Sequence, residues 1–393
     1  MVSTIDHSAR AELRQTNVFV EYDHNYLLKM YRALDEGMPP ELELLRFLRE
    51  SAGYQNIPSV IGTIVYSRRG SFSATLALLE RYVPNQGNGW GVARDAVANY
   101  LERILSTREE PGRMNIQYPL YDGAAAEIPE YMRDMIGGVF LEQMNLLGRR
   151  TAELHCALAS KSDDDAFRPE PFTHLYRRSL YQSFQALVRK TLVKLEKKAG
   201  ELDEGDRADI TKILGLRTRI VEVMRGGTSS DVDGYKMRIH GNLHLGHVIY
   251  TGRDFVYSGF GGDPLRPLGE RRLKYSPLRD LASLIRSIHE VAWRSLTDKH
   301  EFRSIDVDSL APWLTPWAHT VTGELMRAYL TVDGIEKLIP GDRGAVRRLV
   351  GAYMIAESLE RALSDLERNH SRLLGHLREI TTILDVLGGK QES

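Results

Sequence analysis

The hydrophobic pattern of this chain changes once, near residue 84, and that change limits the folds open to it. Up to this point apolar residues alternate as in strands: residues 12–30 predict two short strands around the turn "YDHN", and "VIGTIVYSRR" and "FSATLALLERYVP" predict two more. Between these pairs, "PPELELLRFLRESA" at 39–52 opens with two prolines and carries an apolar face, which indicates a helix.

Beyond "VPNQGNGW" the pattern becomes helical over most of 92–225 and again from 278 to about 387, where 344–387 predicts one long or broken helix. Two short strands are predicted between these regions, within 236–260. We therefore predict an α+β, two-lobed fold with a small β-rich N-lobe at 1–83, a hinge at 84–92 and a large, mostly helical C-lobe at 93–393. Its cleft is the default ligand site.

Composition excludes several classes of function. The 393 residues carry 52 Lys and Arg against 53 Asp and Glu, so no net field attracts nucleic acid or an anionic membrane. The single cysteine, Cys156, lies in a helical pattern typical of a core residue. We find no leader and no run of about 18 apolar residues, so we expect a cytoplasmic protein. The acidic triplet at 163–165 is interpreted as a cap or turn rather than a metal site.

The stretch "RIHGNLHLGHVIYTGRDFVYSGFGGDPLRPLGERR" has the layout of a phosphotransferase catalytic loop followed by a metal-binding turn. Together with "NVFVEYDHNYLLKMYR", "LALLERYVPNQGNGW", "LLGRRTAELHCALAS" and "PLRPLGERRLKYSPLRDLASLIRS", it resembles the maltokinase family, kinases with a protein-kinase-like fold that phosphorylate maltose and often occur fused to trehalose synthase. The family usually carries an N-terminal cap ahead of the first hairpin, and this sequence begins just before that hairpin, so we expect the cap either to be absent or to belong to a longer parent protein.

The resemblance assigns roles to residues of the N-lobe. Lys29 falls where the family's nucleotide-binding lysine lies, and Glu43 or Glu41 on the next helix is expected to pair with it. The alternative is that Lys29 ends a strand and the glutamates belong to a solvated first helical turn.

Several positions depart from what the resemblance implies. The family's catalytic aspartate is Asn242, which cannot act as a base, and its second magnesium ligand is His247. The first aspartate of its metal-binding turn is Gly259, so Asp263 is the only carboxylate left there. We therefore expect no metal site. If the enzyme is active instead, we expect Asp263 to serve as the substitute metal ligand. His240, His244 and His247 are not interpreted as a zinc site, because His240 and His244 match family positions with scaffold roles and no further Cys or carboxylate ligands lie nearby in the sequence.

The C-terminal sugar contacts implied by the resemblance are also missing, because Ser364, Arg368 and Asn369 replace the expected aromatic and acidic residues. The Arg279–Asp280 pair matches the family, but a structural role is as consistent with this pair as a functional one.

These departures predict a maltokinase-like pseudokinase that scaffolds or regulates a protein partner, such as trehalose synthase or another α-glucan enzyme. We expect no cofactor and leave self-association open. The alternative is an active enzyme that uses magnesium and ATP to convert maltose to maltose 1-phosphate. A third class is a sensor that binds nucleotide or sugar without turnover.

Overall fold

The structure is a computed structural model that describes residues 9–14, 17–68, 72–107, 128–161, 163–201, 204–263, 266–297, 304–366 and 370–388. Two compact units divide the chain. The first, here called the N-terminal unit, comprises Met1–Gly89, Leu154–Arg168 and Met237–Lys274; the second, the helical unit, comprises Trp90–Glu153, Pro169–Lys236 and Tyr275–Ser393.

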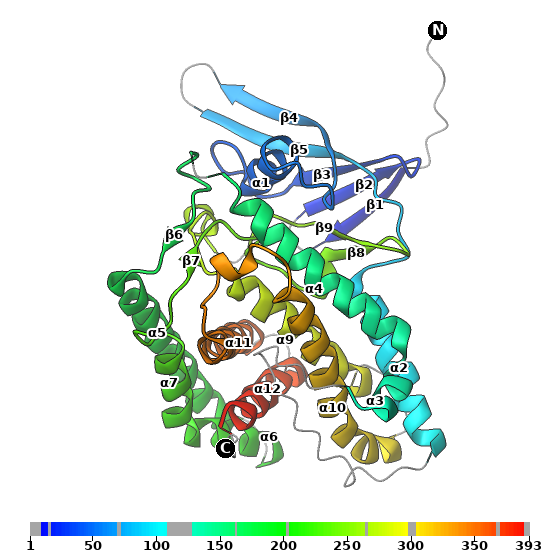
Figure 1. Cartoon of the computed structure of the whole chain (residues 1–393), viewed down its shortest axis with the longest axis vertical. Helices are drawn as coiled ribbons and strands as arrows, with labels where there is room; N and C mark the ends of the chain where they lie inside the picture. Colours follow the sequence, from blue (N-terminus) through cyan, green and yellow to red (C-terminus); the bar gives the residue numbers. More distant parts are fainter. Residues whose placement is uncertain are drawn as a thin grey trace. The chain divides into compact units, whose positions relative to one another are not determined.

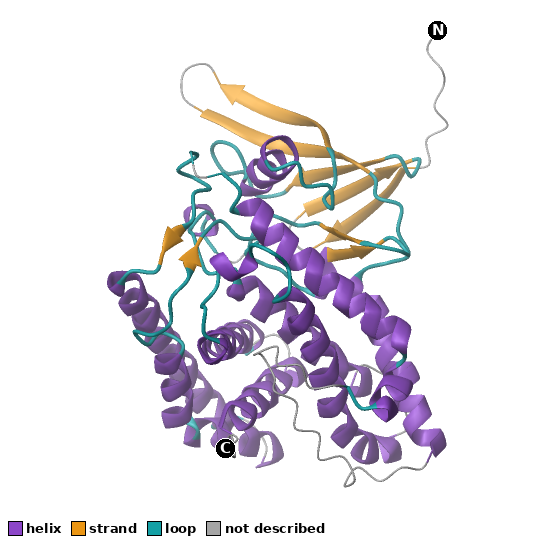
Figure 2. Ribbon diagram, viewed as in Figure 1, coloured by secondary structure: helices purple, strands orange, loops and turns teal. Residues whose placement is uncertain are grey.

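The N-terminal unit is built on an antiparallel sheet in the order β1-β2-β3-β5-β4 (Figures 1 and 2). Its strands are β1 (Ala9–Arg14), β2 (Asn17–Tyr22), β3 (Tyr26–Tyr31), β4 (Val60–Arg68) and β5 (Phe72–Arg81). The four strands predicted from the sequence are confirmed, and β1 was not predicted. In the turn between β2 and β3, Asp23 and His24 adopt positive φ angles, a conformation that short polar side chains tolerate better than most.

The predicted helix after β3 is also confirmed. It consists of α1 (Pro40–Arg46), which continues into a π-helical turn, η1 (Phe47–Ser51). Pro40 suits the first helical turn because its missing N–H would have no intrahelical acceptor there. Leu44, Leu45 and Leu48 are buried, whereas the beginning of the helix carries Glu41 and Glu43. This orientation leaves the two acidic side chains free to meet groups from other parts of the unit.

The segment 237–274 differs from its prediction in two ways. One strand was expected at 236–241 and one across 247–260. The first is not formed beyond the end of β7 (Tyr235–Lys236), and the second is a pair of strands, β8 (Val248–Tyr250) and β9 (Phe255–Tyr257). In addition, the segment was assigned to the C-lobe but forms part of the N-terminal unit. Backbone hydrogen bonds explain this, because Tyr257 N–H donates to Asn56 and Gln86 N–H donates to Tyr250. A short helix, α8 (Leu268–Arg271), and a 3-10 turn, η3 (Leu245–His247), complete the segment.

The helical unit contains the remaining elements. They are α2 (Gly89–Thr107), α3 (Glu130–Ile136), α4 (Gly138–Leu158), α5 (His174–Ala199), α6 (Glu204–Gly215), α7 (Arg217–Gly226), α9 (Leu278–Thr297), α10 (Ser304–Tyr329), η4 (Ile335–Lys337), α11 (Arg343–Asp365) and α12 (His370–Gly388), with β6 (Glu170–Pro171) paired to β7 (Tyr235–Lys236). Helix α4 ends inside the N-terminal unit, and α2 begins there.

Helix α11 lies at the centre of the helical unit and contacts α5, α7, α9 and α12. It is buried along most of its length, and Trp313 and Trp317 of α10 are among the largest fully buried side chains. The sequence predicted one long or broken helix at 344–387. The structure has the broken form, and the two helices, α11 and α12, pack against each other. Among the described helices, none is long and apolar enough to cross a membrane.

Candidate functional site

The main cavity of the N-terminal unit has a volume of about 590 Å³, within the range of small-molecule sites. Its walls come from strands β2, β3 and β5 of the sheet, the extended stretch that follows β5 up to residue 88, and the loop and turn at 242–262. The stretch 33–41 that leads into α1, Pro58, and Leu268 and Arg271 of α8 complete the lining. Lys29, Asn242, His247 and Gly259, all singled out in the sequence, line this cavity, and the structure therefore brings them together.

Lys29 forms a buried ion pair with Glu41. Its Nζ lies 2.8 Å and 2.7 Å from the two carboxylate oxygens of Glu41, and the hydroxyl of Tyr31 donates to the same carboxylate at 2.9 Å. Lys29 and Glu41 are 7% and 2% exposed. Burial alone would raise the pKa of Glu41, but Lys29 and Tyr31 together lower it, so the carboxylate stays ionised. The alternative of a strand-end lysine beside solvated glutamates is wrong.

Glu43 is not the partner of Lys29. Its carboxylate accepts hydrogen bonds from Arg238 Nη1 at 3.0 Å and from Arg272 Nε at 3.2 Å, both about 200 residues further along the chain. These arginines lower the pKa of Glu43 against the opposing effect of burial. Glu41 and Glu43 point to different sides because residues two apart on a helix do not share a face. Helix α1 is therefore held to the rest of the unit at two places.

The catalytic-loop position is occupied by an asparagine whose backbone organises two histidines. Asn242 N–H donates to His240 Nδ1 at 3.3 Å, and His240 Nε2 lies 2.9 Å from the carbonyl oxygen of Ser258. The carbonyl oxygen of Asn242 lies 2.9 Å from His247 Nδ1. These contacts assign the proton of His240 to Nε2 and that of His247 to Nδ1. Burial lowers the pKa of His247 to about 4, so its ring is neutral near pH 7.

His247 also explains why residue 259 carries no side chain. Gly259 has φ +80°, and a Cβ built on it would lie 2.8 Å from Cδ2 and 2.9 Å from Nε2 of His247. Contacts this short cannot be accommodated without moving the ring. The imidazole therefore occupies the volume that a side chain on residue 259 would enter. The two departures at these positions, twelve residues apart in the sequence, form one structural feature.

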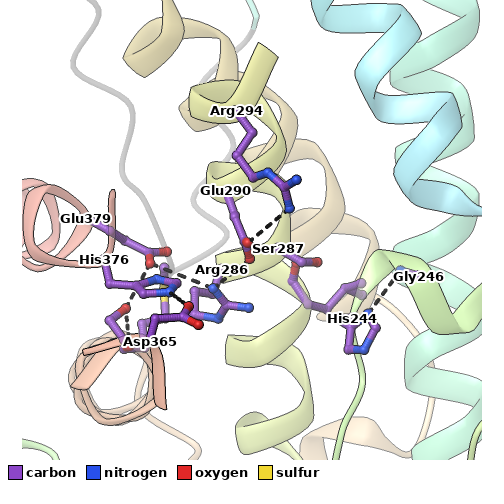
Figure 3. A network of polar contacts seen from close by, with 12 residues as sticks. His244, Gly246, Arg286, Ser287, Glu290, Arg294, Asp365, His376 and Glu379 are labelled. Atoms are coloured by element: carbon purple, nitrogen blue, oxygen red, sulfur yellow. Dashed lines mark hydrogen bonds and ion pairs between the residues drawn. The ribbon is translucent and has the colours of Figure 1, made fainter. Parts of the chain in front are cut away.

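The remaining sequence candidates contribute little to the cavity. Asp263, the substitute ligand considered from the sequence, is not among the residues that line it, and its carboxylate lies 4.0 Å from Nε of Arg266. Residue 264 of the same turn lies outside the described residues. The rings of His244 and His247 have centroids 4.1 Å apart, and His244 Nδ1 accepts from Gly246 N–H (Figure 3). These contacts agree with scaffold roles for the histidines.

The residues present do not fit a magnesium ion of the kind that the fold family implies. Magnesium prefers oxygen ligands, but position 247 offers an imidazole and position 259, a glycine, offers no side chain. Within the described part of the chain, no three His, Cys, Asp or Glu side chains converge in a metal-binding arrangement.

Glu80 of β5 is a cavity residue that was not predicted from the sequence. It is 7% exposed, lines the cavity on the face of the sheet that also carries Lys29, and has a pKa raised to about 8 by burial and by the charge of Glu41. Among the described residues its side chain forms no hydrogen bond or ion pair. A charged residue inside the otherwise apolar run "LALLE" was the available signal.

The helical unit contains a separate network of buried charges (Figure 3). Arg286 Nη1 lies 2.9 Å from Glu290 and 4.0 Å from Glu379, while the Ser358 hydroxyl lies 2.9 Å from Glu379. His376 Nε2 lies 3.1 Å from Asp365. This network adds polar side-chain contacts to the apolar packing among α9, α11 and α12.

The pair Arg279–Asp280 belongs to the same region. Arg279 lies 3.5 Å from Glu357 and 3.8 Å from Glu360 and stacks on Tyr275, which indicates a structural role in joining α9 to α11. Ser364 lies on α11, whereas Arg368 and Asn369 lie outside the described residues.

Comparisons with known proteins agree with a kinase architecture. No protein-family model matches the chain. The glucosamine kinase of Mycolicibacterium smegmatis (strain ATCC 700084 / mc(2)155) is 24% identical over 298 residues, which cover 74% of this chain and 62% of that protein. The chain therefore spans less than two thirds of the length of this relative.

Solved structures of a glucosamine kinase are similar to the chain in fold. The complex with glucosamine, ADP and inorganic phosphate superposes with a TM-score of 0.66 at 18% identity, covering 96% of this chain and 76% of that one. A second crystal form gives a TM-score of 0.65 at 17% identity, covering 93% and 77%. The chain thus has the α+β kinase-like fold that was predicted, with a small antiparallel sheet and a mostly helical remainder.

Proposed function

We propose that this protein is a pseudokinase of sugar-kinase type, related to the maltokinases, which keeps the ligand cavity of a kinase but does not transfer phosphate. The kinase-like fold is supported by the structural similarity described above. The proposed absence of phosphotransfer is supported by the residues of the cavity.

The observation that carries the proposal is the packing of His247 over Gly259. Phosphoryl transfer depends on metal ions that bridge the phosphates and on a carboxylate near the attacking hydroxyl. Here the metal-binding position has no side chain, and the imidazole fills the space needed for one. The site is therefore closed to a carboxylate at this position rather than merely lacking it.

Asn242 supports the same proposal. Its amide has no titration near neutral pH and cannot accept the proton of a sugar hydroxyl, and loss of an acid–base group costs about 10²- to 10⁴-fold in rate. The ordered backbone of Asn242 instead fixes the positions of His240 and His247. The loop thus remains structured although its base is missing.

A phosphotransfer assay tests the proposal. Purified protein at high concentration would be incubated with radiolabelled ATP, magnesium and either maltose or glucosamine, with the M. smegmatis glucosamine kinase as positive control. We expect no sugar phosphate. Steady product formation by the wild-type chain, abolished by Lys29→Met, would overturn the proposal and support the alternative of an active sugar kinase.

For its partner we propose a protein of α-glucan metabolism, such as a trehalose synthase, as the family resemblance implies. A fold that keeps its core without phosphotransfer can act by contact with another protein. Co-purification of tagged chain and trehalose synthase, followed by measurement of the complex with purified components, tests this. Absence of a complex at micromolar concentrations would contradict it.

A further inference from the structure

The carboxyl of Glu80 is a buried polar group with no partner of its own in the described structure. It lies on β5 inside the cavity of the N-terminal unit and is 7% exposed. Buried polar groups in folded proteins are nearly always hydrogen-bonded, because leaving one unsatisfied costs free energy. A group that faces a cavity can find this partner on a ligand.

The charged groups around Glu80 determine its protonation. Glu41 of α1 raises the pKa of Glu80, Lys29 of β3 lowers it, and burial has the largest effect, giving a value of about 8. Glu80 is therefore mainly a neutral carboxylic acid near pH 7. Such an acid offers one donor and one acceptor side by side. This pattern matches a heterocycle in which a ring nitrogen adjoins an amino group.

The cavity also offers aromatic surface beside Glu80. Phe19, Tyr31 and Tyr82 line it, and aromatic side chains provide faces on which a planar ring can pack. Lys29 Nζ lies 5.6 Å from the ring centroids of both Phe19 and Tyr31, so these two rings already surround the buried ammonium.

The charge of the lining is unsuited to a polyphosphate. Because Glu80 is neutral near pH 7, three carboxylates face three cations among the described residues that line the cavity, so the lining carries no net positive charge to offset a polyphosphate: Glu21, Asp35 and Glu41 against Lys29, Arg81 and Arg271. In active kinases magnesium offsets the charge of the phosphates, and the residues at 247 and 259 do not fit that ion.

We infer that this cavity binds an uncharged, planar, amino-substituted heterocycle such as the base of adenosine, with Glu80 as its polar anchor, in preference to nucleoside di- or triphosphates. The inference rests on the proposed absence of phosphotransfer and adds the class of ligand to it. It differs from the ADP complex of the similar glucosamine kinase in excluding the phosphates.

Isothermal titration with adenosine, AMP, ADP and ATP, in EDTA and in magnesium, tests the ligand class. We expect adenosine to bind best and ATP to bind at least about tenfold more weakly, with no recovery in magnesium. Tighter binding of ADP or ATP than of adenosine, or no binding of adenosine at millimolar concentration, overturns the inference. Formation of sugar phosphate overturns the proposed function instead, so the two failures are distinguishable.

Variants of Glu80 test the anchor. Glu80→Ala should weaken adenosine binding about tenfold or more, whereas Glu80→Gln keeps one donor and one acceptor and should stay within about threefold of wild type. Wild-type affinity should fall as the pH rises through about 8, and the affinity of Glu80→Gln should not. Glu50→Gln, the same change of side chain at an exposed position outside the cavity lining, is the matched control. Equal affinities for Glu80→Ala and wild type, with both variants folded by circular dichroism, would sink the assignment.

Discussion

Lys29 and Glu41 form a bidentate ion pair in which Nζ lies 2.7 Å and 2.8 Å from the two carboxylate oxygens. Both side chains are almost completely buried, so the pair joins β3 to α1 inside the unit rather than on its surface. Removal of either side chain would leave the other as an unpaired buried charge, which is strongly unfavourable.

The first prediction concerns this pair. Glu41→Ala should lower the free energy of unfolding by about 3 kcal/mol, because it leaves the buried ammonium of Lys29 without its counter-charge. The double variant Lys29→Met/Glu41→Leu should cost less than Glu41→Ala alone, since it removes both charges. Urea denaturation followed by circular dichroism measures both. A double variant less stable than the single one would contradict this explanation.

The second prediction concerns the packing of His247 over Gly259. Gly259→Ala should destabilise the chain by about 2 kcal/mol through its positive φ and its contact with the ring. In a His247→Ala background the contact disappears and only the backbone strain remains. A double-mutant cycle should therefore give a coupling of about 1 kcal/mol or more, measured by denaturation. Additive effects of the two changes would mean that the ring and residue 259 do not compete for space.

The same feature predicts how attempts to restore catalysis will fail. Asn242→Asp alone should yield no sugar phosphate, because position 259 still lacks a carboxylate. Gly259→Asp added to it should lower the melting temperature while His247 is present, and His247→Asn should recover part of that loss. Differential scanning calorimetry of the three variants checks this order. Activity in Asn242→Asp alone would contradict it.

The third prediction is a loss of stability in mild acid. Burial lowers the pKa of His247 and His319 to about 4 and that of His289 to about 3, from an ordinary value of 6.5. Below pH about 6.5 these three histidines therefore bind protons in the unfolded chain but remain neutral in the folded chain. The stabilisation from these neutral rings is present above pH about 6.5 and is lost as the pH falls toward 4, by roughly 1–2 kcal/mol for each ring.

His319→Gln provides the test for this prediction. The variant cannot titrate, so its free energy of unfolding should change less between about pH 7 and about pH 5 than that of the wild type. Identical pH profiles for the two proteins would show that His319 titrates normally in the folded state.

The fourth prediction is a loss of stability as the pH rises. Burial raises the pKa of Glu379 to about 8 from its ordinary 4.5, although Arg286 and Ser358 oppose this. The folded state holds a proton that the unfolded state releases, so this stabilisation is full below about pH 4.5 and is lost as the pH rises through 8. Glu379→Gln should therefore stabilise the chain on the order of 1–2 kcal/mol at about pH 8.5 and change little at about pH 5. A variant that is less stable at high pH would mean that the ionised carboxylate is required by Arg286.

Much of the N-terminal unit followed from local pattern. Alternating apolar residues and the Asp23–His24 turn defined β2 and β3, and the two prolines marked the beginning of α1. Strand β1 was missed because "ARAELR" contains charged residues at alternate positions and few β-branched or aromatic ones. Such a composition is common in edge strands, whose charges discourage pairing with other chains.

The candidate site depended on contacts that local pattern does not contain. The sequence placed Lys29 correctly but could not choose between Glu41 and Glu43, because the choice depends on Arg238 and Arg272 far along the chain. Gly259 and His247 could be seen only as separate departures from the family's residues. Glu80 was overlooked because its significance comes from the cavity that it faces.

The ring of His247 over a residue without a Cβ makes positions 247 and 259 interdependent. A side chain at position 259 would enter the volume of the imidazole, so it requires a displaced ring or a smaller residue at position 247. A library that varies these two positions together should therefore yield folded members that a library at position 259 alone does not.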